Sequence, residues 1–103
     1  SWPGVLTPTE CFAAIKAGAD GLKIFPASII GADGIKAMRA VLPATMPVYA
    51  VGGVGTDDFG TYAKAGCDGF GLGSGIFKPG MTVDDVSRAA VAYVRAHDAV
   101  FGA

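Results

Sequence analysis

The chain has 103 residues, of which 51% are hydrophobic and 17% are charged, and its formal net charge is −1. This length suits one small domain with a large share of core residues, and the singly scattered lysines and arginines offer no patch to a nucleic acid. No apolar run is long enough to span a membrane and no signal peptide opens the chain, so we expect a cytoplasmic protein.

Breaks at glycine and proline divide the chain into alternating extended and helical segments. Residues 5–6 form the end of a strand, and a helix that begins at Thr7 or Thr9 ends at Gly18. Pro43 stops the second helix. The further predicted strands are 20–25, 47–51 and 68–72, and the further predicted helices are 34–42, 56–65 and 82–97. A loop of small residues precedes the second helix, and the strand 47–51 is apolar throughout, as expected when both faces are covered.

The sequence contains an internal repeat. The segment KAGADGL at residues 16–22 reappears as KAGCDGF at residues 64–70, and a helix-like stretch precedes each copy. Such self-similarity is typical of stacked supersecondary units. Each unit consists of a helix, a glycine stop and a strand.

About four strands alternate with four helices, which predicts an α/β fold with a parallel sheet and right-handed crossovers. An eightfold β/α barrel needs about 200 residues or more. We therefore interpret residues 1–103 as the C-terminal half of one TIM (β/α)8 barrel domain. An isolated half would leave two bare sheet edges and an exposed apolar inner face, so a further segment or another chain is expected to complete the ring.

Lys23 is the candidate catalytic residue. It lies in the apolar strand that precedes Pro26, and a lysine forced into such surroundings tends to lose its proton and become a nucleophile. The alternative is a lysine whose side chain extends to the barrel mouth and stays solvated. Gly71 occupies the corresponding position of the repeat, so the fold itself needs no long side chain there.

Two glycine-rich turns follow successive strands. Gly52 and Gly53 end the strand 47–51, and Gly73 and Ser74 follow the strand 68–72 and open into a short helical turn. Glycines let backbone N–H groups approach an anion, a helix start adds a favourable dipole, and the loops after the last two strands of a barrel often bind phosphate. The pattern predicts a phosphate site, with ligand-free tight turns as the alternative. An amine beside it suggests Schiff-base chemistry on a phosphorylated keto compound.

The motifs PGVLTPTE at 3–10, LKIFPA at 22–27, IKA at 35–37, VGGV at 51–54 and GLGS at 71–74 occur in this order. Together they resemble the family of pyruvate-forming class I aldolases that cleave 2-keto-3-deoxy-6-phospho sugar acids, over essentially the whole chain. The resemblance implies that Lys23 forms the imine and that Gly52, Gly53, Gly73 and Ser74 bind the substrate phosphate. We expect Phe25 and Pro26 to shape the pocket wall beside the imine.

The branch of this family is suggested by Val51, because galactonate-type enzymes carry valine before the glycine pair and gluconate-type enzymes carry threonine. The resemblance also implies a homotrimeric lyase that needs no metal or cofactor. The family takes its general base from a glutamate on an early strand, and the one glutamate here, Glu10, is explained by helix capping. We therefore expect the 103 residues alone to lack full activity and the missing base to lie in the other half.

Other assignments stay open at this point. The nearest is a gluconate-type aldolase with the opposite preference at C4, and a second is another phosphate-binding barrel, such as an epimerase or a thiamine-phosphate-type synthase. A third is a non-catalytic half-barrel that assembles with itself or with another chain. The sequence further predicts that Cys11 and Cys67 are packed thiols and that Arg39 is solvated on a helix surface.

Overall fold

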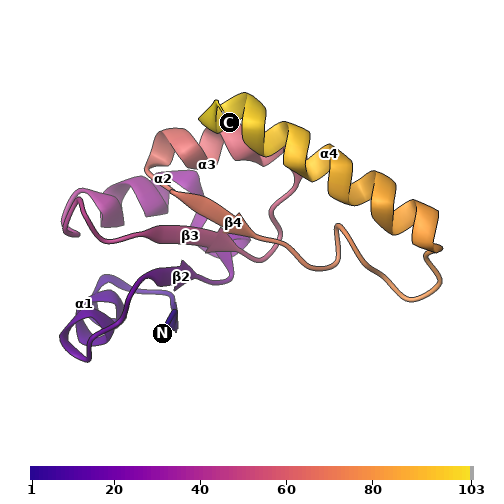
Figure 1. Ribbon diagram of the computed structural model, residues 1–103. Helices are drawn as coiled ribbons and strands as arrows, with labels where there is room; N and C mark the ends of the chain where they lie inside the picture. Colours follow the sequence, from indigo (N-terminus) through magenta and orange to yellow (C-terminus); the bar gives the residue numbers. More distant parts are fainter. Residues whose placement is uncertain (103) are drawn as a thin grey trace.

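The computed structural model describes residues 1–102 of the chain (Figure 1). Strands and helices alternate along the whole length, as predicted. The elements are β1 (Gly4–Val5), α1 (Pro8–Lys16), β2 (Leu22–Ile24), α2 (Ala27–Arg39), β3 (Val48–Val51), the 3-10 helix η1 (Thr56–Asp58), α3 (Phe59–Ala65), β4 (Gly69–Gly71) and α4 (Val83–Phe101).

The four strands form one parallel sheet in the order β1-β2-β3-β4. In its register, Lys23 lies between Gly4 and Tyr49, and Tyr49 lies beside Gly69. Sequential parallel strands joined by helices are the arrangement from which β/α barrels are built. The predicted number and parallel direction of the strands are confirmed.

The internal repeat is offset along the strands relative to the register of the sheet, as a closed barrel requires. The repeat places Gly71 at the position of Lys23, whereas the register runs from Lys23 through Tyr49 to Gly69. The repeat therefore advances two residues along the strands for every two strands crossed. Continued around eight strands, this stagger gives the shear of about 8 that closes a β/α barrel.

One face of the sheet is buried beneath helices, and the other is open. Leu22, Ile24, Val48 and Ala50 point toward the helices and are buried. Figure 1 shows α2, α3 and α4 along one side of the sheet. Tyr49 is 37% exposed on the opposite face, so the expectation that β3 is covered on both faces is wrong for the residues that the structure describes.

The helix starts follow from their capping residues. The Thr7 hydroxyl accepts the N–H of Glu10, and the Glu10 carboxylate accepts the N–H of Thr7, so α1 begins where the sequence predicted. Thr82 and Asp85 make the same exchange at α4. The predicted loop before the second helix is wrong, because α2 already begins at Ala27 and bends at Gly31.

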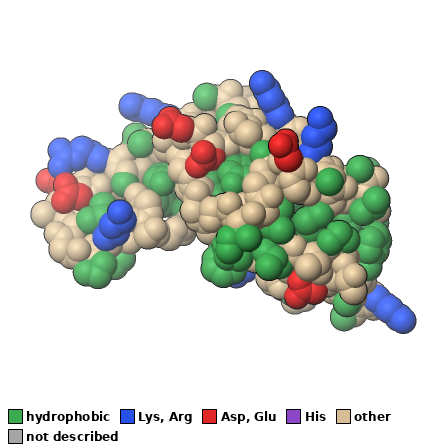
Figure 2. Space-filling model, turned by 180° about the vertical axis from the view of Figure 1, so that it is seen from behind, with side chains coloured by type: hydrophobic (Ala, Val, Ile, Leu, Met, Phe, Trp, Pro, Cys, Tyr) green, Lys and Arg blue, Asp and Glu red, His purple; other side chains and the backbone are tan. Residues whose placement is uncertain are grey.

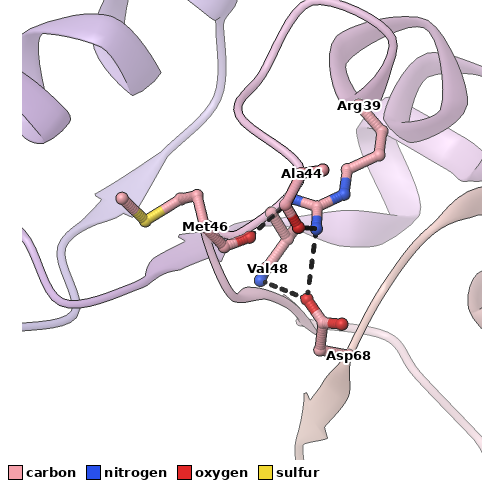
Figure 3. A network of polar contacts seen from close by, with 5 residues as sticks. All are labelled: Arg39, Ala44, Met46, Val48 and Asp68. Carbon is pink, nitrogen blue, oxygen red and sulfur yellow. Dashed lines mark hydrogen bonds and ion pairs between the residues drawn. The ribbon is translucent and has the colours of Figure 1, made fainter.

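Arg39 connects segments at the N-terminal ends of β3 and β4. The prediction that it is a solvated surface arginine is wrong. Its side chain is 18% exposed, and its guanidinium donates to the carbonyl oxygens of Met46 at 2.6 Å and Ala44 at 3.1 Å. It also lies 3.5 Å from the carboxylate of Asp68, which accepts the N–H of Val48 at 3.0 Å (Figure 3). The network ties the end of α2 to the starts of β3 and β4.

Cys11 and Cys67 are free, buried thiols, as predicted. Burial raises the pKa of both thiols, that of Cys67 to about 11. Both side chains belong to the core between the sheet and its helices. Within residues 1–102, no helix combines the length and the apolar character needed to cross a bilayer.

The Arg39 network makes the first prediction. We expect Arg39→Met to lower the free energy of unfolding by about 2–3 kcal/mol, because two carbonyl oxygens and a carboxylate lose a charged donor. Urea unfolding followed by circular dichroism measures the loss. The control is Arg88→Ala, which breaks an exposed ion pair with Asp85 and should leave stability nearly unchanged. Equal losses in the two variants would contradict this role of Arg39.

The Cys67 thiol makes stability depend on alkaline pH. The unfolded chain releases this proton near pH 9, whereas the folded chain keeps it until about 11. The unfolded state therefore binds fewer protons in this interval, and the free energy of unfolding falls as the pH rises through it. Urea unfolding between pH 8 and 11 should show the fall, and Cys67→Ala should reduce its slope. An unchanged slope in the variant would rule out this thiol as a source.

Candidate active site

Lys23 projects from the middle of β2 onto the open face of the sheet. Its side chain is half-buried and lines a hollow of about 530 Å³. The strand pairing explains this position, because Lys23 alternates with the buried Leu22 and Ile24. The lysine is therefore less enclosed within residues 1–102 than the sequence predicted. The hollow is lined by Trp2, Lys23, Tyr49, Val51, Gly71 and Leu72.

The amine of Lys23 is directed toward the C-terminal end of its strand. Its Nζ lies 5.6 Å from the centre of the Phe25 ring, the residue that follows β2. The ring is 49% exposed, so an apolar surface stands beside the amine. A cation over an aromatic face is a favourable arrangement, and the ring restricts where the flexible lysine side chain can lie.

The glycine pair lies against the other side of this segment. Gly52 and Gly53 have φ angles of +96° and +71°, which side-chain-bearing residues rarely adopt. A Cβ atom on Gly52 would lie 2.9 Å from the Phe25 ring, and one on Gly53 would lie 2.8 Å from the Cβ of Ser28. The loops after β2 and β3 thus touch each other because residues 52 and 53 carry no side chain.

The second glycine turn has the predicted position and opens into the predicted short helical turn. The carbonyl oxygen of Gly73 accepts the N–H groups of Ile76 and Phe77, three and four residues on, at 2.9 Å and 3.0 Å. This single turn is not continued into a helix, so few peptide dipoles are aligned there. A Cβ on Gly75 would collide with the Tyr93 phenol of α4, which explains why a glycine also follows Gly73 and Ser74.

Several backbone N–H groups in these turns are available to an anion. Among residues 1–102, the N–H groups of Gly53, Gly73 and Ser74 donate to no protein acceptor. We call these three N–H groups the anion cradle. They follow β3 and β4, which are adjacent strands, so both turns lie at the same edge of the sheet. Unpaired amides at the ends of parallel strands suit a phosphate oxygen.

The structure brings several of the expected site residues together. Lys23 and Val51 line the same hollow, and Phe25 and Pro26 lie against Gly52. Gly73 and Ser74 do not line the hollow. They follow Gly71 and Leu72, which line it at the end of β4.

Two lining residues, Trp2 and Tyr49, were missed by the sequence reasoning. Their rings lie 4.6 Å apart between centroids. The available signal was Gly21, because a Cβ there would lie 2.4 Å from the Trp2 ring.

Three carboxylates of the described residues, those of Glu10, Asp58 and Asp68, make contacts away from the hollow. Glu10 accepts the N–H groups of Leu6 and Thr7, both at 3.1 Å, in the capping of α1. Asp58 accepts the N–H of Gly55 at 2.8 Å, and Asp68 belongs to the Arg39 network. No carboxylate lines the hollow around Lys23 in this part of the chain. Nor do residues 1–102 contain a group of three or more His, Cys, Asp or Glu side chains that could hold a metal ion.

The effect of a side chain at Gly52 can be divided into backbone strain and steric collision with neighbouring atoms. We expect Gly52→Ala to destabilise the fold by about 1–3 kcal/mol more than Gly80→Ala. Gly80 has a similar φ angle of +90° but open space where a Cβ would lie, whereas a Cβ at Gly52 meets Phe25 and Pro26. Urea unfolding of the two variants gives the difference. Equal destabilisation would mean that the loops after β2 and β3 are not packed as described.

Two curated proteins with similar sequences are both named as aldolases. The chain is 55% identical over 100 residues to a probable 2-dehydro-3-deoxy-6-phosphogalactonate aldolase of Rhizobium meliloti (strain 1021). It is 46% identical over 95 residues to the 2-dehydro-3-deoxy-6-phosphogalactonate aldolase of Escherichia coli (strain K12). These matches cover 97% and 92% of the chain but 47% and 46% of the relatives, so the chain spans about half the length of the curated relatives it matches. No model of a protein family matches the chain.

Solved structures agree with the sequence comparison. A native KDPGal structure superimposes with a TM-score of 0.93 at 44% identity, over 98% of this chain and 49% of that one. A thiamine phosphate pyrophosphorylase from Pyrococcus furiosus superimposes with a TM-score of 0.76 at 29% identity, over 96% and 48%. The predicted fold class, half of a TIM (β/α)8 barrel, is confirmed. The chain is therefore similar to 2-dehydro-3-deoxy-6-phosphogalactonate aldolases over about half of their length.

Proposed function

We propose that these residues form the C-terminal half of a class I aldolase barrel in which Lys23 is the imine-forming residue. One observation carries the proposal: the Lys23 amine lies over the Phe25 ring, and the same ring packs on the glycine pair that begins the anion cradle. An amine and an anion site thus share one wall at the end of the sheet. The names of the curated relatives support aldolase chemistry.

The proposed reaction cleaves 2-dehydro-3-deoxy-6-phosphogalactonate. The amine of Lys23 adds to the C2 ketone and expels water, which leaves an iminium that accepts electrons. A base removes the proton of the C4 hydroxyl, the C3–C4 bond breaks, and glyceraldehyde 3-phosphate leaves. The electron pair of the broken C3–C4 bond moves into the iminium and forms an enamine, which is protonated at C3 and hydrolysed to pyruvate and free Lys23. The base is assigned to the other half of the barrel, since the carboxylates described above lie away from the hollow.

Each remaining site residue has a proposed part in binding. The anion cradle, formed by the N–H groups of Gly53, Gly73 and Ser74, binds the phosphate. Gly52 gives this turn the space to lie against Phe25 and Pro26, which form the apolar wall beside the imine. Val51 faces the hollow next to Lys23 and contacts the substrate near C4.

The substrate assignment follows from Val51 and from the names of the relatives. A valine offers no hydroxyl to a substrate group, whereas the threonine of a gluconate-type enzyme does. The alternative, 2-dehydro-3-deoxy-6-phosphogluconate, has the opposite configuration at C4. The ratio of cleavage rates on the two epimers, measured on a complete barrel that contains these residues, distinguishes the assignments. A preference for the gluconate epimer would overturn this reading of Val51.

The proposal extends to the setting of the whole protein. The resemblance to the aldolase family supports a cytoplasmic homotrimer that acts in galactonate catabolism without a metal or cofactor. A designed protein cage made by fusing symmetric oligomeric domains superimposes on this chain with a TM-score of 0.94, which is consistent with an oligomer. A non-catalytic half-barrel and another phosphate-binding barrel are the competing assignments, and neither requires an imine at Lys23.

The imine is testable without the general base of the cleavage step. We expect sodium borohydride in the presence of pyruvate to attach one reduced pyruvyl group to the chain, and peptide mass spectrometry should find it on Lys23. Lys23→Met should abolish the attachment, and Lys36→Met, which changes an exposed lysine on α2, should not. Attachment at other lysines, or none in the folded protein, would reject Lys23 as the imine residue.

A further inference from the structure

Tyr62 is a buried phenol that the proposed reaction does not use. It lies on α3 and is 7% exposed. Its hydroxyl donates to the carbonyl oxygen of Ala27 at 3.3 Å, across 35 residues of sequence. Burial, and secondly the charge of Asp58, raise the pKa of Tyr62, so the hydroxyl keeps its proton and remains a donor. The ring without its hydroxyl, as in phenylalanine, would fill this part of the core, so the hydroxyl needs a separate explanation.

The acceptor of this hydrogen bond is adjacent in the chain to residues that contact both parts of the proposed site. Ala27 is the first residue of α2 and follows Pro26, which ends the segment that carries Lys23 and Phe25. The next residue, Ser28, donates its N–H to the carbonyl oxygen of Gly52 at 3.1 Å. One peptide group, between Ala27 and Ser28, thus connects the Tyr62 phenol to the carbonyl oxygen of Gly52.

The bond from Ser28 determines which way the glycine peptide faces. The peptide between Gly52 and Gly53 is trans, so its C=O and N–H groups point in opposite directions. Because the Gly52 carbonyl points toward α2, the Gly53 N–H points away from α2. This N–H belongs to the anion cradle and donates to no acceptor among residues 1–102.

We propose that Tyr62 is a positioning residue for phosphate binding. Its hydrogen bond to Ala27 fixes the first turn of α2, this turn holds the Gly52 carbonyl, and the held peptide directs the Gly53 N–H toward the anion. Tyr62 itself does not line the hollow around Lys23. The inference rests on the proposed function, and it adds a residue from α3 to the determinants of the phosphate site.

The substitution Tyr62→Phe removes the hydroxyl and keeps the ring. At 3.3 Å the hydrogen bond is longer than an average O–H···O bond, so we expect a moderate effect. The affinity for inorganic phosphate should fall about threefold to tenfold. Pyruvate trapping on Lys23 should be unchanged, because that step involves no phosphate. A purely structural tyrosine would lower the melting temperature without this difference between the two ligands.

The experiment is a titration of the ¹⁵N-labelled 103-residue chain with inorganic phosphate, followed by amide NMR shifts. The wild type, Tyr62→Phe and Cys11→Ala are compared, the last removing a buried thiol from α1 in the same core. In Tyr62→Phe, the amide signals of Ser28 and Gly53 should move before phosphate is added, and phosphate should bind more weakly. In Cys11→Ala, both amides and the affinity should match the wild type.

The other outcomes contradict either the positioning role of Tyr62 or the proposed phosphate site. Wild-type affinity and unmoved Ser28 and Gly53 amides in Tyr62→Phe would overturn the positioning role alone. Equal loss of affinity in Cys11→Ala would overturn it as well, since general destabilisation would then suffice. If phosphate shifts no amide of Gly53, Gly73 or Ser74 in the wild type, the proposed phosphate site fails and this inference fails with it.

Discussion

The contact between the Phe25 ring and Gly52 is the constraint on which the candidate site depends. The ring has the Lys23 amine over its face and leaves no room for a Cβ atom on Gly52. One aromatic side chain thereby contacts both the candidate nucleophile and the candidate phosphate-binding turn, which belong to different strands and their loops.

The open sheet face explains both the accessibility of the site and the main error of the sequence reasoning. Lys23, Tyr49 and Val51 face a side that no element among residues 1–102 covers, and Figure 2 shows hydrophobic side chains gathered at the surface of the molecule. In a closed barrel these positions would be interior. The chain spans about half of its curated relatives, and half of a barrel leaves that interior exposed.

Much of the fold could be predicted because local signals agreed with the overall arrangement. Thr7 with Glu10 and Thr82 with Asp85 marked helix starts that the structure contains. Lys23 and the glycine turns stood out because a charged residue in an apolar strand and paired glycines after strands have few explanations other than function. The proposed roles of these residues remain predictions, although the structure places Lys23, Phe25 and Gly52 together.

The misses share a physical cause, which is that long-range partners leave little local trace. Arg39 resembles any surface arginine on a helix, and only the folded chain brings it to Met46 and Asp68. Tyr62 finds its acceptor 35 residues away. Such contacts depend on how elements pack, whereas capping and turn signals depend on neighbours in sequence.

The central claim is that one ligand can engage the Lys23 amine and the anion cradle at the same time. The most direct measurement is a crystal structure of the chain after borohydride reduction with 2-dehydro-3-deoxy-6-phosphogalactonate. The account predicts continuous density from Lys23 Nζ to C2 of the sugar acid, with phosphate oxygens within hydrogen-bond distance of the Gly53 and Ser74 N–H groups. An adduct whose phosphate lies away from both turns, or a ligand attached to a different lysine, would contradict it.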